Sequence, residues 1–308
     1  MLPIFCFRLR PLPAILFALA LATPAFSQSD QYLRTGHEMP GLYGFDSSLV
    51  PPQGLSIETV GVYYSASRST DRNGVGTGIA GQVQHASMHP TVTWVSPWKI
   101  FGGLYAARLR LSMGANAQNP RAENVGSDKI GSGDHYIEPL ALYWSAERGA
   151  VSLRIGSWLA SGDFAADDPN SLGKGFDSQV VTLGWTYRFD DAQLWNYSLL
   201  TRYSSHGKVE GRDSRPGDDV IVDWSVVRKL NEKWDLGLVG YGVFQTSRDK
   251  GSESAAELGY YGTAGLGVGA RWSVPWANGK GSLRIYQEFN SFNHTEGTLV
   301  AGGLSFRH

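Results

Sequence analysis

Cysteine is almost absent from this sequence. The single residue, Cys6, lies near the N-terminus, so the rest of the chain can form neither a disulfide nor a thiolate metal site. Lys and Arg number 27 against 28 Asp and Glu, and this balance gives no basic footprint for nucleic acid. Beyond the N-terminal region there is no run of 18 apolar residues, which excludes a transmembrane helix.

The first 27 residues have the pattern of a secretion signal. Arg8 and Arg10 precede an apolar stretch over residues 12–21, and small residues surround Phe26 before Gln28. A basic start, a short apolar middle and a small-residue exit predict a signal peptide over residues 1–27, cleaved near Ser27. A membrane anchor is the alternative, but the stretch is shorter than the roughly 20 residues that span a bilayer.

Glycine and aromatic residues are plentiful instead. The chain has 38 Gly, 10 Trp, 14 Tyr and 13 Phe. Apolar residues alternate with polar or small ones, as in Val181, Leu183 and Trp185, which are separated by Thr182 and Gly184. A period of two places one set of side chains on each face of a β-strand. The sequence therefore predicts an all-β fold.

Twelve such strands are predicted, and short links alternate with long ones. The strands are expected near residues 55–66, 79–95, 100–114, 134–146, 150–161, 178–189, 194–204, 217–229, 233–247, 257–273, 281–290 and 297–307. Tight turns are expected at 96–98, 147–149, 190–193, 231–232 and 275–280, and long polar links at 67–78, 115–133, 162–177, 205–216, 248–256 and 291–296. Strict alternation of short turns and long loops with an even strand number is typical of outer-membrane barrels.

The opposing interpretation is a soluble β-sandwich or propeller. A sandwich core requires apolar residues on the inner face, but here that face carries charges. Strands of this length exceed the usual ~5–6 residues and suit a tilted crossing of the bilayer. Residues 55–308 are therefore predicted to form an antiparallel transmembrane β-barrel of about 12 strands in a Gram-negative outer membrane, where membrane lipids and lipopolysaccharide surround it.

The last strand bears on assembly. Val300, Leu304 and Phe306 share one face, and His308 continues their phase. Outer-membrane barrels commonly end in an aromatic residue that the outer-membrane assembly machinery reads. Here Phe306 lies two residues before the end, so the machinery remains an expected partner with an atypical signal.

The charged set on one strand face is predicted to line the lumen, because charges that face lipid at the bilayer midplane cost roughly 2–4 kcal/mol each. The candidate residues are Arg108, Arg110, Glu138, Arg154, Arg188, Arg202, Asp223, Tyr261, Arg271, Arg284 and Glu288. Two interpretations stay open. The arginines either select permeants by charge or form ion pairs that stiffen the barrel.

An apolar segment precedes the first strand. Residues 28–54 include Met39 to Phe45 and Leu49 to Pro52, and no strand pattern covers them. A 12-stranded lumen has more room than an 8-stranded one, which side chains fill. The segment is expected either to enter the lumen as a plug or to lie as a strap under the first strand. As a plug, it would contact Tyr261, Arg154 and Arg271.

Enzymatic interpretations find little support. His85 and His89 share a strand face about 13 Å apart at ~3.3 Å per residue, too far to bind one ion. Asp134, before His135 at a strand start, is explained by turn capping. A Ser/His/acid set could assemble across strands, but the sequence marks no particular serine. No metal, cofactor or catalytic residue is therefore predicted.

Several short motifs resemble one family. They are Pro40-Gly41-Leu42, Pro51-Pro52-Gln53-Gly54, Gly131-Ser132-Gly133-Asp134, Glu138-Pro139-Leu140-Ala141-Leu142-Tyr143-Trp144, Ser161-Gly162-Asp163-Phe164, Asn170-Ser171-Leu172-Gly173, Tyr187-Arg188-Phe189-Asp190 and Gly217-Asp218-Asp219. Over residues 38–308 the chain resembles the outer-membrane protein family of the meta-pathway of phenol degradation. The family usually has Pro-Thr where Ala160-Ser161 stand here.

That resemblance implies a barrel that passes hydrophobic or aromatic compounds, and it carries over no catalytic residue. The expected function is an outer-membrane channel or transporter for such permeants. The alternatives are a structural or adhesive barrel without transport activity and a lipid-modifying enzyme of the outer membrane.

Overall fold

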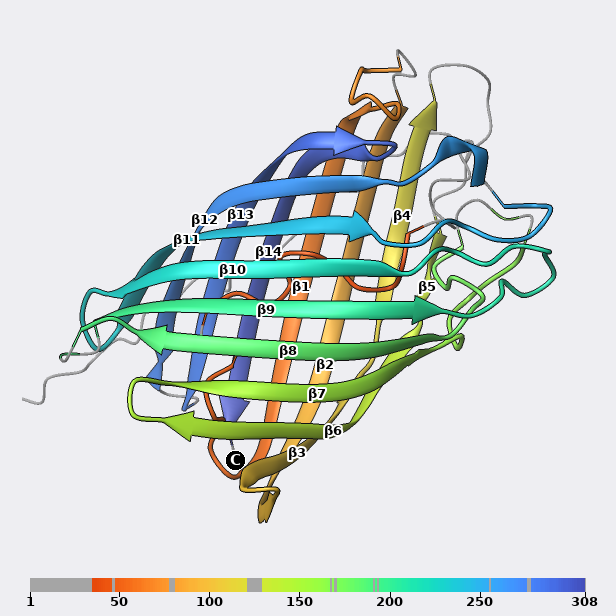
Figure 1. Ribbon diagram of the computed structural model, residues 1–308. Coiled ribbons are helices and arrows are strands. Elements are labelled where there is room, and N and C mark those ends of the chain that lie inside the picture. The colour runs from red at the N-terminus through yellow and green to blue at the C-terminus, as the bar shows by residue number, and fades with distance from the viewer. Residues whose placement is uncertain are drawn as a thin grey trace, which may run out of the picture.

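The computed structural model describes residues 35–45, 48–77, 81–120, 129–166, 168, 171–190, 192, 194–254, 256–275 and 278–307. The expected signal peptide, its cleavage near Ser27 and the C-terminal His308 lie outside these residues. Within them the chain forms one closed antiparallel sheet (Figure 1). No helix of the described part is long and apolar enough to cross a membrane.

The sheet contains fourteen strand segments. They are β1 (Gly54–Ser69), β2 (Gly81–Ile100), β3 (Gly103–Arg110), β4 (Met113–Pro120), β5 (Lys129–Ser132), β6 (His135–Ala146), β7 (Gly149–Leu159), β8 (Ser178–Arg188), β9 (Trp195–His206), β10 (Asp219–Lys229), β11 (Trp234–Gln245), β12 (Gly262–Val274), β13 (Gly279–Phe292) and β14 (Thr295–Arg307). A short 3-10 helix, η1 (Ala256–Leu258), precedes β12.

These segments make twelve crossings, as the sequence predicts. β3 and β4 both pair with β2 and continue one another, and β5 and β6 pair with β4 and β3 in the same way. Each of the two pairs is therefore one interrupted strand. β1 pairs with both β2 and β14, which closes the sheet. Closure pairs the spanning strands on both sides, as a membrane-spanning sheet requires, while β5 at the long-loop side pairs with β4 alone.

The interruption between β3 and β4 lies opposite Pro90. Thr91 of β2 pairs with Arg110, and Met88 pairs with Met113, so the gap faces Pro90. The amide of Leu111 donates to the carbonyl of Pro90 at 2.9 Å, but proline has no N–H to return. The effect of this proline in β2 therefore appears as a break in the partner strand.

Three predicted links are wrong. The link expected at 115–133 is partly strand, because β4 continues to Pro120 and β5 begins at Lys129. β2 runs through Ser96 to Trp98 with a register shift, and the turn follows at Phe101 and Gly102. Both turn residues have positive φ, 50° and 78°, which a two-residue type I′ hairpin turn requires. Residues 291–296 were expected to form a long loop, but only Asn293 and His294 separate β13 from β14.

The remaining links divide between the two ends of the barrel. The end that carries the links after β1, β7, β9 and β11 is called the long-loop end, and the opposite end, where β14 finishes, is called the short-turn end (Figure 1). In an outer-membrane barrel the longer loops are extracellular and the short turns periplasmic.

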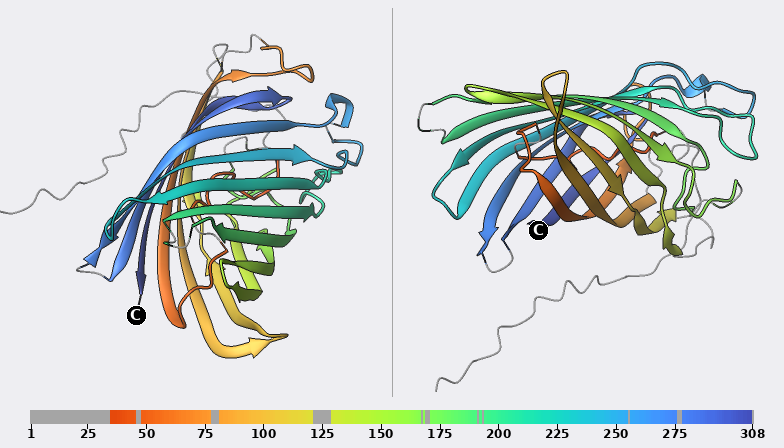
Figure 2. Two further views of the ribbon diagram at one scale, coloured as in Figure 1. Left: turned by 60° about the vertical axis from the view of Figure 1, so that its left-hand side comes forward. Right: turned by 90° about the horizontal axis from the view of Figure 1, so that it is seen from below.

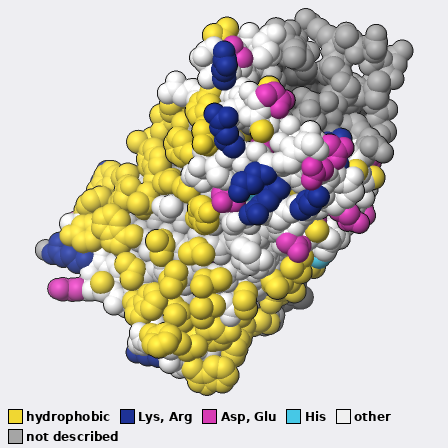
Figure 3. Space-filling view, turned by 45° about the vertical axis from the view of Figure 1, so that its right-hand side comes forward, with side chains coloured by type: hydrophobic (Ala, Val, Ile, Leu, Met, Phe, Trp, Pro, Cys, Tyr) yellow, Lys and Arg dark blue, Asp and Glu magenta, His cyan; other side chains and the backbone are white. Residues whose placement is uncertain are grey.

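The outer surface is apolar, as the period of two predicts. Leu183, Leu238 and Val268 are 58%, 53% and 60% exposed although they lie in the middle of strands. Hydrophobic side chains cover the middle of the barrel, and charged side chains gather toward the end that carries the long links (Figure 3). Such an apolar band is the surface that lipid covers in an outer-membrane barrel.

Aromatic side chains gather near the short-turn end of this surface. Trp94 and Trp98 are packed edge to face at 5.4 Å between ring centroids, and Trp234 lies 5.8 Å from Trp272. Tyrosine and tryptophan are enriched where a bilayer meets water, because their rings are apolar with one polar atom. The short-turn end therefore has the aromatic girdle expected of an interface.

Introducing a charged residue on the outer face tests whether this face contacts lipid. We expect Leu183→Arg, in the middle of β8, to lower the free energy of unfolding in lipid vesicles by about 2–4 kcal/mol. Asn231→Arg, in a short turn, serves as the control and should have little effect. The free energy of unfolding of both variants is measured by urea titration, with the folded fraction read from heat-modified gel mobility. Equal stability of the two variants would contradict a lipid-facing Leu183.

Candidate functional site

Residues 35–45 and 48–53, here called the threaded segment, run inside the barrel from the long-loop end to the short-turn end (Figure 2). At the long-loop end Lys174 donates to the carbonyl oxygen of Thr35 at 2.9 Å. At the other end Val50 packs on a cluster that contains Val95 and Tyr143. Of the two placements expected for the segment, the structure shows the one inside the lumen.

Arg202 of β9 holds the segment at mid-depth. Its guanidinium forms ion pairs with Glu38 of the segment and with Asp223 of β10. Asp223 also accepts from the amide of Gly41 at 2.6 Å, and the indole of Trp158 donates to Glu38 at 2.9 Å. A buried charge is stable only when it is paired and hydrogen-bonded. Here the guanidinium of Arg202 pairs with both carboxylates, and each carboxylate also accepts a hydrogen bond from an N–H group.

Tyr43 lies among three arginines of the wall. Its ring centroid is 5.0 Å from Arg110 Cζ, 5.4 Å from Arg154 Cζ and 4.9 Å from Arg202 Cζ, and Arg110 also donates to its hydroxyl. A cation within about 6 Å of an aromatic centroid is attracted by the ring quadrupole. The expected contact of the segment with Arg154 is therefore present.

Phe45 extends this aromatic contact toward the short-turn end. Arg271 Cζ lies 5.5 Å from the Phe45 ring centroid, so the second expected arginine contact is also present. The ring leaves no room for a side chain at Gly269, where a Cβ would lie 2.7 Å from Phe45 Cζ. Glycine in β12 thus allows the segment to approach the wall.

The third expected contact, Tyr261, has a different main partner. It is buried just before β12, and its hydroxyl donates to Asp219 of β10 at 3.1 Å. It also belongs to the apolar cluster that contains Leu42 of the segment. Tyr261 therefore joins the wall strands to each other and packs near the segment.

Two cavities lie beside the threaded segment. The long-loop cavity measures about 290 Å³, and the short-turn cavity measures about 200 Å³. His89 of β2 lines both, so the two cavities are adjacent. The long-loop cavity is lined by apolar wall residues, including Val62, Ile221, Val243 and Leu299, and by polar and charged residues such as Gln84, His85 and Glu288.

The other residues that the sequence assigns to the lumen also lie on the inner face. Arg108 is 3.5 Å from Glu138, and Arg271 is 2.6 Å from Asp235. Arg284 lines the short-turn cavity. Arg188 continues the inward phase of β8 at its short-turn end. Their part in selecting permeants remains a prediction.

Glu288 of β13 is buried and satisfied without a cation. It accepts from the hydroxyls of Tyr64 at 2.7 Å and Tyr241 at 3.0 Å, and from the amide of Gly297 at 2.9 Å. Arg108, Arg202 and Arg271 therefore form ion pairs, as the second interpretation of the inner charges expects. Glu288 instead accepts hydrogen bonds from two tyrosine hydroxyls and one amide.

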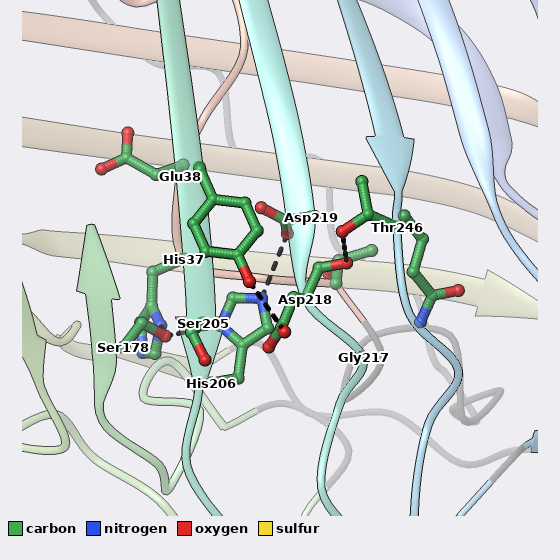
Figure 4. Close-up of polar contacts among 12 residues, drawn as sticks. His37, Glu38, Ser178, Ser205, His206, Gly217, Asp218, Asp219 and Thr246 are labelled. Carbon is green, nitrogen blue, oxygen red and sulfur yellow. Dashed lines mark hydrogen bonds and ion pairs between the residues drawn. The ribbon is translucent and has the colours of Figure 1, made fainter. Parts of the chain in front are cut away.

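A further cluster, here called the histidine network, anchors the segment near the long-loop end (Figure 4). His37 Nε2 lies 2.9 Å from Asp134 Oδ2, and its Nδ1 lies 2.7 Å from Ser178 Oγ. Ser178 Oγ is also 2.7 Å from His206 Nδ1, and His206 Nε2 is 3.2 Å from Asp219. Five polar side chains therefore form one continuous chain.

The protons of this chain can be counted. Each Nε2 faces a carboxylate, which only accepts, so both Nε2 atoms carry hydrogen. Ser178 has one hydroxyl hydrogen and lies between two Nδ1 atoms, so its hydroxyl can donate to only one of them. Burial lowers the pKa of His37, against the attraction of Asp134, and so favours the neutral imidazole at this position.

Asp134 and Lys174 show how this network is balanced. Burial acts to raise the pKa of Asp134, but hydrogen bonds from His37 and from the amides of Lys174 and Gly162 outweigh it and lower the pKa. Burial lowers the pKa of Lys174 to about 8, against the attraction of Asp134 and Asp219. The carboxylate of Asp134 accepts from the amides of Ser161, Gly162 and Lys174 in the link after β7 and also pairs with His37, so turn capping alone does not explain it.

The order Ser178, His37, Asp134 resembles a catalytic triad, but its geometry differs. In the serine protease triad the imidazole bonds serine through Nε2 and the acid through Nδ1, and here the two nitrogens are exchanged. Ser178 is 1% exposed and does not line either cavity, and its hydroxyl is shared with a second histidine. The arrangement fits an anchor for the segment better than a nucleophile.

Sequence reasoning did not identify this network. Its residues come from the segment, the β5–β6 link, β8, β9 and β10, and no spacing along the chain relates them. A partial signal existed, because Ser178, His206 and Asp219 all stand at strand ends that face the long-loop end. A period of two is detected from residues in the middle of strands, so it does not identify functional residues at strand ends.

Removing the bridging serine tests the network. Ser178→Ala leaves two buried imidazole nitrogens without their partner, so we expect it to lower the free energy of unfolding by about 1–3 kcal/mol. Ser204→Ala is the matched control, because Ser204 is equally buried on β9 and its hydroxyl has no hydrogen-bond partner. Denaturant titration should find the control near wild type. A similar loss in both variants would argue against the network.

A cysteine pair tests the threaded path. Ser48 is fully buried against Gly184 of β8, on the inner face. In a chain without residues 1–27, Ser48→Cys combined with Gly184→Cys should form a disulfide on mild oxidation. Ser48→Cys combined with Leu183→Cys, whose second cysteine points to lipid, should not. Mass spectrometry of the cross-linked peptides distinguishes them, and cross-linking only in the second pair would place Ser48 outside the barrel.

Comparison with known proteins agrees with the barrel. No curated protein matches this sequence. An outer membrane channel from Pseudomonas putida F1 aligns with a TM-score of 0.75 at 12% identity, over 88% of this chain and all of that one. The autotransporter NalP translocator domain of Neisseria meningitidis aligns at 0.48, with 12% identity over 84% and 90% of the chains. The Pseudomonas putida toluene transporter TodX aligns at 0.42, with 9% identity over 85% and 91%.

The first of these similarities shows a shared outer-membrane barrel fold. The sequence itself gives the family. The family model described as "Putative MetA-pathway of phenol degradation" matches residues 66–302, within the span of the motifs that resemble it. The chain belongs to this family.

Proposed function

We propose that this protein is a passive outer-membrane channel for small hydrophobic or aromatic compounds, narrowed along its length by the threaded segment. The observation that carries the proposal is the pair of adjacent cavities beside the segment, which provide space for small molecules inside the barrel. Sites for small molecules usually measure about 300–1,000 Å³, so cavities of this size suit single-ring compounds.

The chemistry of the long-loop cavity supports a hydrophobic permeant. Val62, Ile221, Val243 and Leu299 form much of its wall, together with the indole of Trp158. An apolar molecule that enters such a cavity leaves water at a gain of roughly 25 cal/mol per Å² buried. A sugar would place hydroxyl groups against these apolar side chains, which is unfavourable wherever a hydroxyl finds no hydrogen-bond partner. Membership of a family whose description refers to phenol degradation agrees with this preference.

Transport without catalysis is the better supported activity. Ser178, the serine in the one Ser/His/Asp arrangement described above, is enclosed by two histidines and lies apart from both cavity walls. The apolar outer belt supports direct contact with membrane lipid. Contacts with lipopolysaccharide and with the assembly machinery, and export by a cleaved signal peptide, stay predictions.

Uptake by intact cells tests the proposal. We expect Gram-negative cells that lack their own porins to take up radiolabelled toluene faster when they express this chain, while uptake of arabinose changes little. The outer leaflet normally slows hydrophobic solutes, so a channel for them should be measurable. Faster arabinose uptake with unchanged toluene uptake would overturn the proposal.

Removing the segment tests the narrowing. Deleting residues 38–50 keeps every strand pairing, because the segment belongs to no strand. In planar bilayers we expect higher single-channel conductance and loss of discrimination against sugars. The control is the oxidised pair of cysteines at positions 48 and 184, which keeps the segment in place and should conduct like wild type. Unchanged conductance of the deletion variant would show that the segment does not narrow the path.

A further inference from the structure

The short-turn cavity has an unusual excess of positive charge. The cationic side chains in its wall are Arg108, Arg110, Arg154, Arg271, Lys280 and Arg284, and Glu58 is the one carboxylate in that wall among the described residues. Glu58 itself is exposed. The cavity therefore concentrates cations around a space of about 200 Å³.

Part of this charge is neutralised by the barrel. Arg108 pairs with Glu138 at 3.5 Å, and Arg271 pairs with Asp235 at 2.6 Å. Lys280, at the start of β13, has a partner as well. Two of the arginines in the wall are therefore held by carboxylates that lie outside the cavity wall.

Three arginines are left. For Arg110, Arg154 and Arg284, no carboxylate of the described residues lies within 4.0 Å, although these side chains belong to residues that are only 4%, 2% and 5% exposed. Buried nitrogen atoms of each also lack a hydrogen-bond partner, namely Nη1 of Arg110, Nε and Nη2 of Arg154 and Nε of Arg284. Among the described residues, these three buried guanidinium groups therefore have no carboxylate counter-ion.

Such an arrangement is costly unless an anion is present. Guanidinium groups stay charged in proteins, so burial cannot neutralise them as it can a lysine. Packing of Arg110 and Arg154 around the ring of Tyr43 offsets some of this cost. It does not supply a negative charge. An anion that enters this cavity would meet these guanidinium groups without first displacing a carboxylate of the described residues.

The same cavity also offers aromatic surface. Tyr43 and Phe45 of the threaded segment line it, opposite wall residues from β1, β13 and β14 such as Val60, Ser282 and Gly303. A ligand can therefore place a negative group on the arginines and a ring beside Tyr43 and Phe45. The planar fork of a guanidinium matches the two oxygens of a carboxylate.

We propose that the short-turn cavity is a binding site for an aromatic monocarboxylate, such as benzoate, on its way through the barrel. Arg110, Arg154 and Arg284 bind the carboxylate, and Tyr43 and Phe45 bind the ring. This inference rests on the proposed channel function and specifies one class among its permeants, aromatic compounds that carry one acidic group. The apolar long-loop cavity favours the ring and disfavours a small hydrophilic anion, so both parts of the ligand contribute.

Calorimetric titration of the purified full-length barrel in detergent tests the site. The probes are benzoate, benzyl alcohol, acetate and inorganic phosphate. We expect benzoate to bind at least about tenfold more tightly than any of the other three, because only benzoate has both the charge and the ring. Binding of acetate or phosphate as tight as that of benzoate would reduce the site to a general anion site and overturn the proposal.

Substitutions assign the binding to the three arginines. Arg154→Gln and Arg284→Gln should each weaken benzoate binding by about tenfold or more, since each removes charge-assisted hydrogen bonds. Arg154→Lys keeps the charge and should show an intermediate affinity. Arg228→Gln is the control, because Arg228 of β10 is exposed and lies outside the cavity. Heat-modified gel mobility verifies that each variant is folded.

The outcomes separate this inference from the channel function. If cells take up toluene but benzoate affinity is the same in wild type and in Arg154→Gln, the channel function stands and the carboxylate site is wrong. If toluene uptake is absent but benzoate binds through the arginines, the site stands without a route for neutral compounds. Absence of benzoate binding in the folded wild type also overturns the site.

Discussion

The constraint on which this structure depends is that hydrocarbon offers no hydrogen-bond partner to a polypeptide backbone. A sheet in that environment must close, and β1 meets both β2 and β14 for this reason. Closure divides each strand into a face toward lipid and a face toward the lumen. Charged side chains can then lie only inside, where they meet one another and the threaded segment. The ion pairs of Arg202 with Glu38 and Asp223 follow from that enclosure.

The fold could be predicted largely because the bilayer enforces a period of two. Leu183 and Val268 had to face outward and Arg154 inward, whatever their neighbours. Strand ends were less predictable. The turn at Phe101 and Gly102 depends on positive φ values, and the proline in Ser96-Pro97-Trp98 led to a turn being predicted there instead. The short link at Asn293 and His294 likewise depends on local backbone conformation, which hydrophobic patterning does not report.

The inner site was predicted only in part. Sequence periodicity placed Arg110, Arg154 and Arg284 on the inner face, but it could not show which arginines find a carboxylate. That depends on which strands become neighbours, as with Arg271 of β12 and Asp235 of β11. The histidine network was missed for the same reason, because His37 and Asp134 meet only through the path of the segment.

The path of the segment also bears on how the barrel assembles. The final seam joins β1 and β14, the two strands most distant in the chain, so the closing step carries a large entropic cost. The segment is fixed at both ends of the lumen, by the network around His37 at one end and by Val50 at the other. Threading it afterwards would drag buried polar groups through a narrow, finished barrel. Closure of the sheet around a segment that already lies inside it avoids this step.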